Sequence, residues 1–212
     1  MLKVNEIFYS LQGESSQAGR PCVFVRLAGC NLRCKYCDTQ NAYENGIEMS
    51  VDQVVRAVAK YSCPLVLVTG GEPLVQPDSL ELMDKLLELE YYVMLETNGS
   101  QNIQPVPEGV LVVLDMKCPG SGEVDKNLYS NIDYLGPMDN CKFVIGDRKD
   151  YEWASDVIFD YGINELSEVL LSPAYEILDP IQLAEWILKD KMPVRLQLQL
   201  HKLVWGPKVQ GK

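Results

Sequence analysis

The chain has 212 residues, 47% of them hydrophobic, and a formal net charge of −11. This length supports one sizeable core, so we expect a single domain over residues 1–212. The acidic balance argues against a nucleic-acid partner, because such proteins present a basic face to the phosphates. The sequence predicts no signal peptide and no membrane segment, so its seven cysteines indicate reduced thiols in the cytoplasm.

Short β-rich runs alternate with amphipathic segments along the chain. The first two strands are expected at residues 6–11 and 22–28, and a polar loop with three cysteines follows them to about residue 48. Ser50 is the expected N-cap of the first helix, because apolar residues recur at helical spacing after it. Further strands are expected at residues 64–71, 91–99, 109–116, 141–147, 167–173 and 194–205, and helices at residues 50–61, 78–90 (capped by Asp78 or Ser79), 148–162 and 181–190.

This alternation favours an α/β fold with parallel strands and right-handed crossovers. About six core strands fall short of the eight in a closed barrel, so we expect an incomplete, open (β/α)6 barrel. The polar stretches TGGE, ETNG, DMKCPGSG and SPAY each follow the C-terminal end of a predicted strand, as does the cysteine loop. Ligands bind at that edge of parallel α/β folds, so one rim is predicted to collect the reactive side chains.

Cys30, Cys34 and Cys37 lie within eight positions of that loop. Thiolates bind soft metals and iron–sulfur clusters. Three protein ligands for a four-iron cluster leave one iron open, and an open coordination position is what a catalytic metal centre needs. The alternative is a zinc knuckle in a non-catalytic interaction protein, with Cys63 or Cys118 as the fourth ligand.

The spacing Cys-x3-Cys-x2-Cys resembles that of the radical SAM enzymes, and Tyr36 fits the aromatic residue common before the last cysteine. The resemblance implies S-adenosylmethionine on the open iron, cleaved by the reduced cluster to a radical that abstracts a hydrogen atom. It assigns no residue as a protein acid or base, and TGGEP resembles the motif that holds the methionyl amino group. The implied cofactor contacts are Tyr36, Asp38, Gly71, Glu96, Asn98, Lys117, Cys118, Pro119, Ser172, Pro173, Ala174 and Tyr175. For those in ETNG and DMKCPGSG, the alternative is that they only form helix caps and tight turns.

The segment EIFYSLQGESSQAGRPCVFVRLAGCNLRCKYCDT closely resembles the opening of the 7-carboxy-7-deazaguanine synthases, and KFVIGD and HKLVWGP extend the likeness. These are small cytoplasmic homodimers on the pathway to queuosine and other 7-deazapurines. The resemblance implies contraction of 6-carboxy-5,6,7,8-tetrahydropterin to 7-carboxy-7-deazaguanine with loss of ammonia, Mg²⁺ dependence, and a flavodoxin or ferredoxin as electron donor. It implies a Mg²⁺ ligand at Thr39 and substrate contacts at Leu11, Gln12, Gly13, Glu14, Arg26 and Thr69.

Several residues and alternatives remain open at this point. Arg26 is able to fork onto a substrate carboxylate or to form a surface salt bridge. His201 is expected to be a structural residue, and Lys212 marks the end that reaches the substrate in some family members. A glycyl-radical-enzyme activase has the same cysteine spacing, although the LQGES segment favours a small pterin substrate. Three further cysteines are expected to be small core residues, namely Cys22, Cys63 and Cys141.

Overall fold

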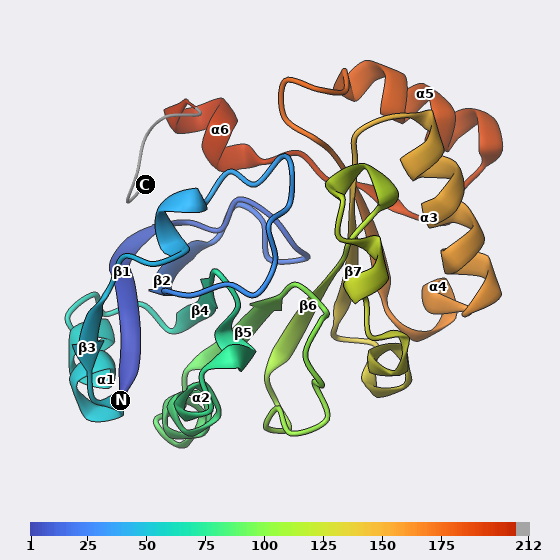
Figure 1. Cartoon of the computed structure of the whole chain (residues 1–212). Coiled ribbons are helices and arrows are strands. Elements are labelled where there is room, and N and C mark those ends of the chain that lie inside the picture. The colour runs from blue at the N-terminus through green and yellow to red at the C-terminus, as the bar shows by residue number, and fades with distance from the viewer. Residues whose placement is uncertain (207–212) are drawn as a thin grey trace.

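A computed structural model describes residues 1–206, and one nine-stranded sheet runs through them (Figure 1). The sheet order is β3-β1-β2-β4-β5-β6-β7-β8-β9. Strand β2 and the strands β4 to β9 pair in parallel, whereas β1 pairs antiparallel with both β2 and β3. The bounds are Leu2–Leu11 (β1), Pro21–Leu27 (β2), Ile47–Met49 (β3), Leu65–Gly70 (β4), Tyr92–Thr97 (β5), Leu111–Met116 (β6), Asn140–Ile145 (β7), Glu168–Pro173 (β8) and Arg195–Leu196 (β9).

The open, partial (β/α)6 barrel predicted from the sequence is confirmed. Strands β2 and β4 to β8 are the six long parallel strands, and the sheet does not close on itself. The hairpin of β1 and β2 extends one edge, and the short β3 was not expected. The helices are Val51–Ala59 (α1), Asp78–Glu88 (α2), Arg148–Asp160 (α3), Ile163–Leu166 (α4), Pro180–Asp190 (α5) and Leu200–Trp205 (α6).

Helix α1 begins as predicted, because Ser50 and Gln53 form a reciprocal capping box at its N-terminus. The predicted cap of α2 was wrong. Pro77 occupies the N-cap position with helical backbone angles, and its fixed φ lets the helix begin directly after it. Asp78 is therefore inside the first turn, where its carboxylate pairs with the amino group of Met1.

The final strand predicted at residues 194–205 was wrong for most of its length. Only β9 pairs with β8, and the chain then leaves the sheet edge and ends its described part as α6. The repeat LQLQL has the period of a strand, but Leu200, Leu203 and Val204 also fit helical spacing. The backbone N–H of Leu200 donates to the Gly13 carbonyl (3.0 Å), so α6 lies over the ends of β1 and β2 (Figure 1).

Two apolar clusters cover the sheet. One joins the strands β1, β2, β4 and β5 to α1 and α2, and the other joins β6, β7 and β8 to α3 and α5. Strand β4 is buried along almost its whole length, as expected for a parallel strand covered on both faces. Within residues 1–206, the helices are all too short or too polar to cross a membrane.

Candidate active site

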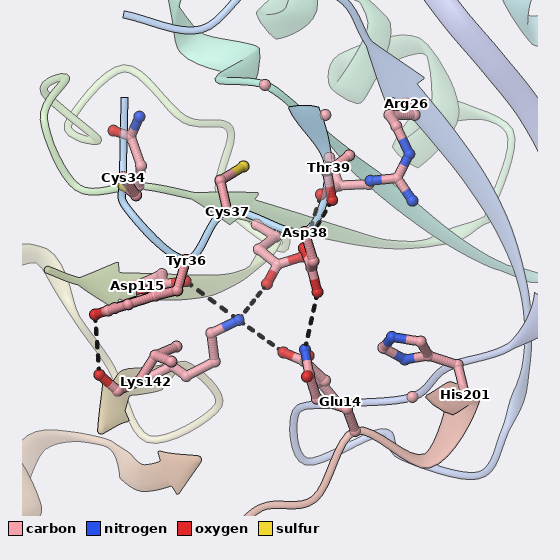
Figure 2. A pocket seen from close by; sticks show the side chains of 18 of the residues that line it. Glu14, Arg26, Cys34, Tyr36, Cys37, Asp38, Thr39, Asp115, Lys142 and His201 are labelled. Atoms are coloured by element: carbon pink, nitrogen blue, oxygen red, sulfur yellow. Dashed lines mark hydrogen bonds and ion pairs between the residues drawn. The ribbon is translucent and has the colours of Figure 1, made fainter. Parts of the chain in front are cut away.

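A cavity of about 420 Å³ opens at the C-terminal ends of the parallel strands, between the cysteine loop and α6. It brings together most of the predicted site residues, although they come from every part of the chain (Figure 2). The predicted residues that line it are Leu11, Gln12, Gly13, Glu14, Arg26, Cys30, Cys34, Tyr36, Cys37, Asp38, Thr39, Thr69, Gly71, Glu96, Asn98, Lys117, Ala174 and Tyr175.

Four predicted cofactor contacts lie outside this lining, namely Cys118, Pro119, Ser172 and Pro173. Neighbouring side chains at a strand end point in opposite directions, so Lys117 faces the cavity while Cys118 packs into the second apolar cluster. The hydroxyl of Ser172 donates to the Gln197 carbonyl (3.0 Å), which ties β8 to the segment after β9. A cofactor role for these four residues stays a prediction.

The cysteine loop, residues 29–39, is irregular and is held by contacts with distant segments. The N–H of Lys35 donates to the Ser121 carbonyl (2.9 Å), and the Asn98 side chain donates to the sulfur of Cys30 (3.8 Å). Burial raises the pKa of the Cys30 thiol and raises that of Cys34 to about 11. These two thiols are therefore protonated at neutral pH and must lose protons to bind metal.

These thiols suit a cluster better than a zinc ion. In residues 1–206, no three His, Cys, Asp or Glu side chains gather closely enough to hold one metal ion, whereas a cubane spreads its thiolates over separate irons. Both candidates for a fourth zinc ligand are buried in apolar clusters away from the cavity, Cys63 in the first and Cys118 in the second. The soft donor set and the space beside it fit a [4Fe–4S] cluster.

The glycine pair of TGGEP packs the end of β4 against the strand that enters the cysteine loop. A Cβ atom at Gly71 would overlap the Gly29 carbonyl, and one at Gly70 would overlap the backbone of Leu27. The N–H of Gly71 donates to the Leu27 carbonyl (3.0 Å), and the N–H of Glu72 donates to that of Gly29 (2.8 Å). The two glycines were predicted to let the backbone approach a ligand closely. They also allow the ends of β4 and β2 to pack directly against each other.

Glu72 organises the rim from a fully buried position. Its carboxylate accepts hydrogen bonds from the N–H of Leu74 (3.0 Å), the hydroxyl of Thr97 (2.8 Å) and the N–H of Asn98 (2.6 Å). Burial raises its pKa although these donors favour the charged form. The residue thus fixes the end of β5, and with it the side chain of Asn98, beside the cysteine loop.

A buried group of charges forms another part of the cavity wall. We call it the Lys142 cluster; its members are Glu14, Glu96, Asp115, Lys117 and Lys142. The ammonium of Lys142 lies 2.7 Å from Glu14, 2.7 Å from Glu96 and 3.2 Å from Asp115. Burial opposes its charge, but the three carboxylates hold its pKa well above the usual value. Asp115 was expected only as part of the polar run DMKCPGSG on the rim, and Lys142 was not predicted as a site residue. A lysine inside the buried run NCKFVI is the signal that could have indicated it.

Arg26 and the two threonines keep polar partners within the cavity wall. The Arg26 guanidinium donates to Glu6 (2.8 Å), so the predicted salt bridge is present, and the side chain also lines the cavity. The hydroxyl of Thr39 donates to Asp38 (2.9 Å), and that of Thr69 donates to Glu96 (3.1 Å). Glu96, predicted as a cofactor contact, thus lies among residues predicted to bind substrate.

Helix α6 closes the cavity from above. Lys202 donates to Asp38 (2.6 Å), and Gln199 donates to Glu14 (2.6 Å), so the helix contacts both walls. His201, expected to be structural, lines the cavity with its imidazole against Gly13, and burial lowers its pKa. Lys212, at which a C-terminal substrate contact was left open, lies outside the described residues.

A partial barrel that carries three thiols at this spacing on its rim defines a radical SAM enzyme, and residues 25–111 match the Radical SAM superfamily. The 7-carboxy-7-deazaguanine synthase of Koribacter versatilis is 42% identical over 99% of this chain and 100% of its own length. That of Chlorobaculum tepidum is 42% identical over 99% and 97%. The chain belongs to the 7-carboxy-7-deazaguanine synthase family.

The fold agrees with that assignment. The crystal structure of QueE from Escherichia coli superposes with a TM-score of 0.77 over 93% of both chains, at 22% identity. Family membership excludes the activase and the non-catalytic zinc protein as explanations of the cysteines. The cofactors of this enzyme are a [4Fe–4S] cluster and S-adenosylmethionine.

Proposed function

We propose that this enzyme converts 6-carboxy-5,6,7,8-tetrahydropterin to 7-carboxy-7-deazaguanine in queuosine and 7-deazapurine biosynthesis. The atoms balance, because substrate and product differ by one molecule of ammonia and no net oxidation occurs. The observation that carries the proposal is a single cavity lined by both the three thiols and a buried cluster of charges. The name of the curated relatives supplies the product.

The cofactor wall is proposed to be the cysteine loop and the strand ends beside it. Cys30, Cys34 and Cys37 would hold the cluster, which with bound S-adenosylmethionine supplies hydrogen-atom abstraction. Lys117 lines this part of the cavity as a cation, and its pKa stays raised because Asp115 outweighs the effect of burial. Its charge suits the carboxylate of the cofactor.

The substrate wall is proposed to use side chains more than the backbone near Gln12. The N–H of Gln12 donates to the Arg20 carbonyl, and its carbonyl accepts from the N–H of Gly19, so both groups are engaged. The carboxylates of Glu14 and Glu96 are acceptors that suit the N–H edge of a pterin. Arg26 keeps further N–H groups beside the one given to Glu6 and suits the substrate carboxylate.

Five further properties belong to the proposal. Thr39 offers a hydroxyl to Mg²⁺, which prefers oxygen ligands and keeps waters. The family resemblance supports a cytoplasmic homodimer that takes electrons from a flavodoxin or ferredoxin. The continuous sheet supports a single radical SAM domain over residues 1–212.

Anaerobic turnover tests the proposed function. Protein reconstituted with iron and sulfide is reduced with dithionite and supplied with S-adenosylmethionine, Mg²⁺ and the tetrahydropterin. We expect a deazapurine absorbance with one ammonia released per product. The amount of S-adenosylmethionine consumed should be much smaller than the amount of product formed. A loaded enzyme that cleaves S-adenosylmethionine but never forms the deazapurine would refute the proposal.

A further inference from the structure

Lys142 is the last of three charged side chains that lie on adjacent strands of the sheet. Glu96, Asp115 and Lys142 come from the neighbouring strands β5, β6 and β7, and Asp115 is the direct register partner of Lys142. Glu14 reaches the same ammonium from the loop after β1. Figure 2 shows the lysine between Asp115 and Glu14, with its amino group directed into the cavity wall.

The contacts of this lysine use its hydrogen-bonding capacity. An ammonium has three N–H donors, and three carboxylates lie within 3.2 Å of its nitrogen. The residue is only 5% exposed, and its three carboxylate partners already account for its three donors. We therefore assign it no direct contact with a ligand. Its influence on a ligand would pass through the carboxylates that it holds.

Two of those carboxylates are fixed at both oxygens. Glu14 accepts from Lys142 and from Gln199, and Glu96 accepts from Lys142 and from Thr69. Each is therefore held in one orientation at the wall that we assign to the substrate. Burial raises the pKa of Glu14, but the attraction of Lys142 and the hydrogen bonds outweigh it, so the group stays ionised.

We propose that Lys142 is a positioning residue for the pterin: it fixes Glu14 and Glu96 as oriented acceptors at the substrate wall. The inference rests on the proposed function. It also explains how an anionic substrate enters a wall rich in carboxylates, since Lys142 and Lys117 offset two of the three negative charges of the cluster.

Replacement of Lys142 by methionine keeps the length of the side chain and removes its charge. The groups that then face the position are Glu14 from the loop after β1, Glu96 from β5, Asp115 from β6, Lys117 directly after β6, and Asp38 from the cysteine loop. His201 lies nearby on α6. Three close carboxylates with one remaining ammonium repel one another, so at least one takes up a proton at higher pH than before. A protonated acceptor no longer matches the N–H edge of the pterin.

The test measures equilibrium binding of the tetrahydropterin to the reconstituted holoenzyme with S-adenosylmethionine, from pH 6 to pH 8.5. For Lys142→Met we expect Kd to rise by roughly tenfold or more at neutral pH, as for other lost charge-assisted hydrogen bonds. The rise should be larger at pH 6 than at pH 8.5, while iron and sulfide content stay unchanged. Lys85→Met removes an exposed lysine that pairs with Asp52 and Glu81, and should leave Kd unchanged.

The double variant Lys142→Met/Asp115→Asn separates position from net charge and relieves the repulsion if the single variant does not fold. It keeps the net charge of the cluster at its native value but still removes the donor of Glu14 and Glu96. Binding should remain several-fold weaker than in the wild type. A Kd within about twofold of the wild type in either folded variant would overturn the inference. An equal rise in the Kd of Lys142→Met at all pH values would overturn it as well. A wild-type enzyme that neither binds nor converts the pterin would instead overturn the proposed function.

Discussion

The cysteine loop and the Lys142 cluster line the same cavity, yet they are built in different ways. The loop has no regular secondary structure, and partial burial raises the pKa of the Cys30 and Cys34 thiols, so these two carry protons in the absence of metal. Three members of the cluster, Glu96, Asp115 and Lys142, lie on neighbouring strands, and the carboxylates of the cluster already pair with its lysines. The substrate wall is therefore preformed by the sheet, whereas the cofactor wall becomes complete only when metal displaces protons.

Loss of a cluster ligand should give the largest effect and should affect one wall only. Cys34→Ala removes one of three thiolates, and we expect activity to fall by roughly a thousandfold or more because the cluster is lost. Pterin binding should change by less than about threefold, since the Lys142 cluster is untouched. Turnover and equilibrium binding on the same sample check both statements, and Cys22→Ala, a core cysteine, serves as a control for thiol loss. Equal loss of turnover and binding would contradict the separation of the walls.

Loss of the Glu72 carboxylate should weaken the connection between the two walls. Glu72→Ala leaves three donors without their acceptor at the ends of β4 and β5, and we expect a loss of about 3 kcal/mol in the free energy of unfolding. Urea unfolding of the iron-free protein measures it. Glu81→Ala, at an exposed carboxylate on α2, is the control and should unfold like the wild type. A stable Glu72 variant that also loads a full cluster would show that this residue does not organise the rim.

Acid should produce the smallest effect, and it should act on the charged wall. The pKa of Glu14 and that of Asp115 are held below their ordinary values, 4.5 and 3.8, because their lysine partners outweigh burial. The unfolded chain thus binds more protons in that range, and stability must fall as pH drops below about 4.5. Urea unfolding between pH 6 and pH 3 should show this slope, and Lys142→Met should make it shallower. An unchanged slope in that variant would argue against the lysine as its source.

The two walls also differ in how well the sequence predicts them. The cysteine loop is local, so the spacing of Cys30, Cys34 and Cys37 indicates its chemistry without a structure. The members of the Lys142 cluster lie far apart in the chain, and only the pairing of β5, β6 and β7 brings them together. Helix α6 was not predicted because the segment before it, LQLQL, repeats leucine at the period of a strand. The contact of this helix with Gly13 depends on tertiary structure, which the local pattern does not contain.

The most direct test of the account is to measure pterin binding before and after the cluster is loaded. We predict that iron-free protein binds the tetrahydropterin within about tenfold of the affinity of the loaded enzyme, because the Lys142 cluster is preformed. S-adenosylmethionine should bind only the loaded form. If the pterin fails to bind until the cluster and S-adenosylmethionine are in place, the sheet does not preform the substrate wall and the central claim is wrong.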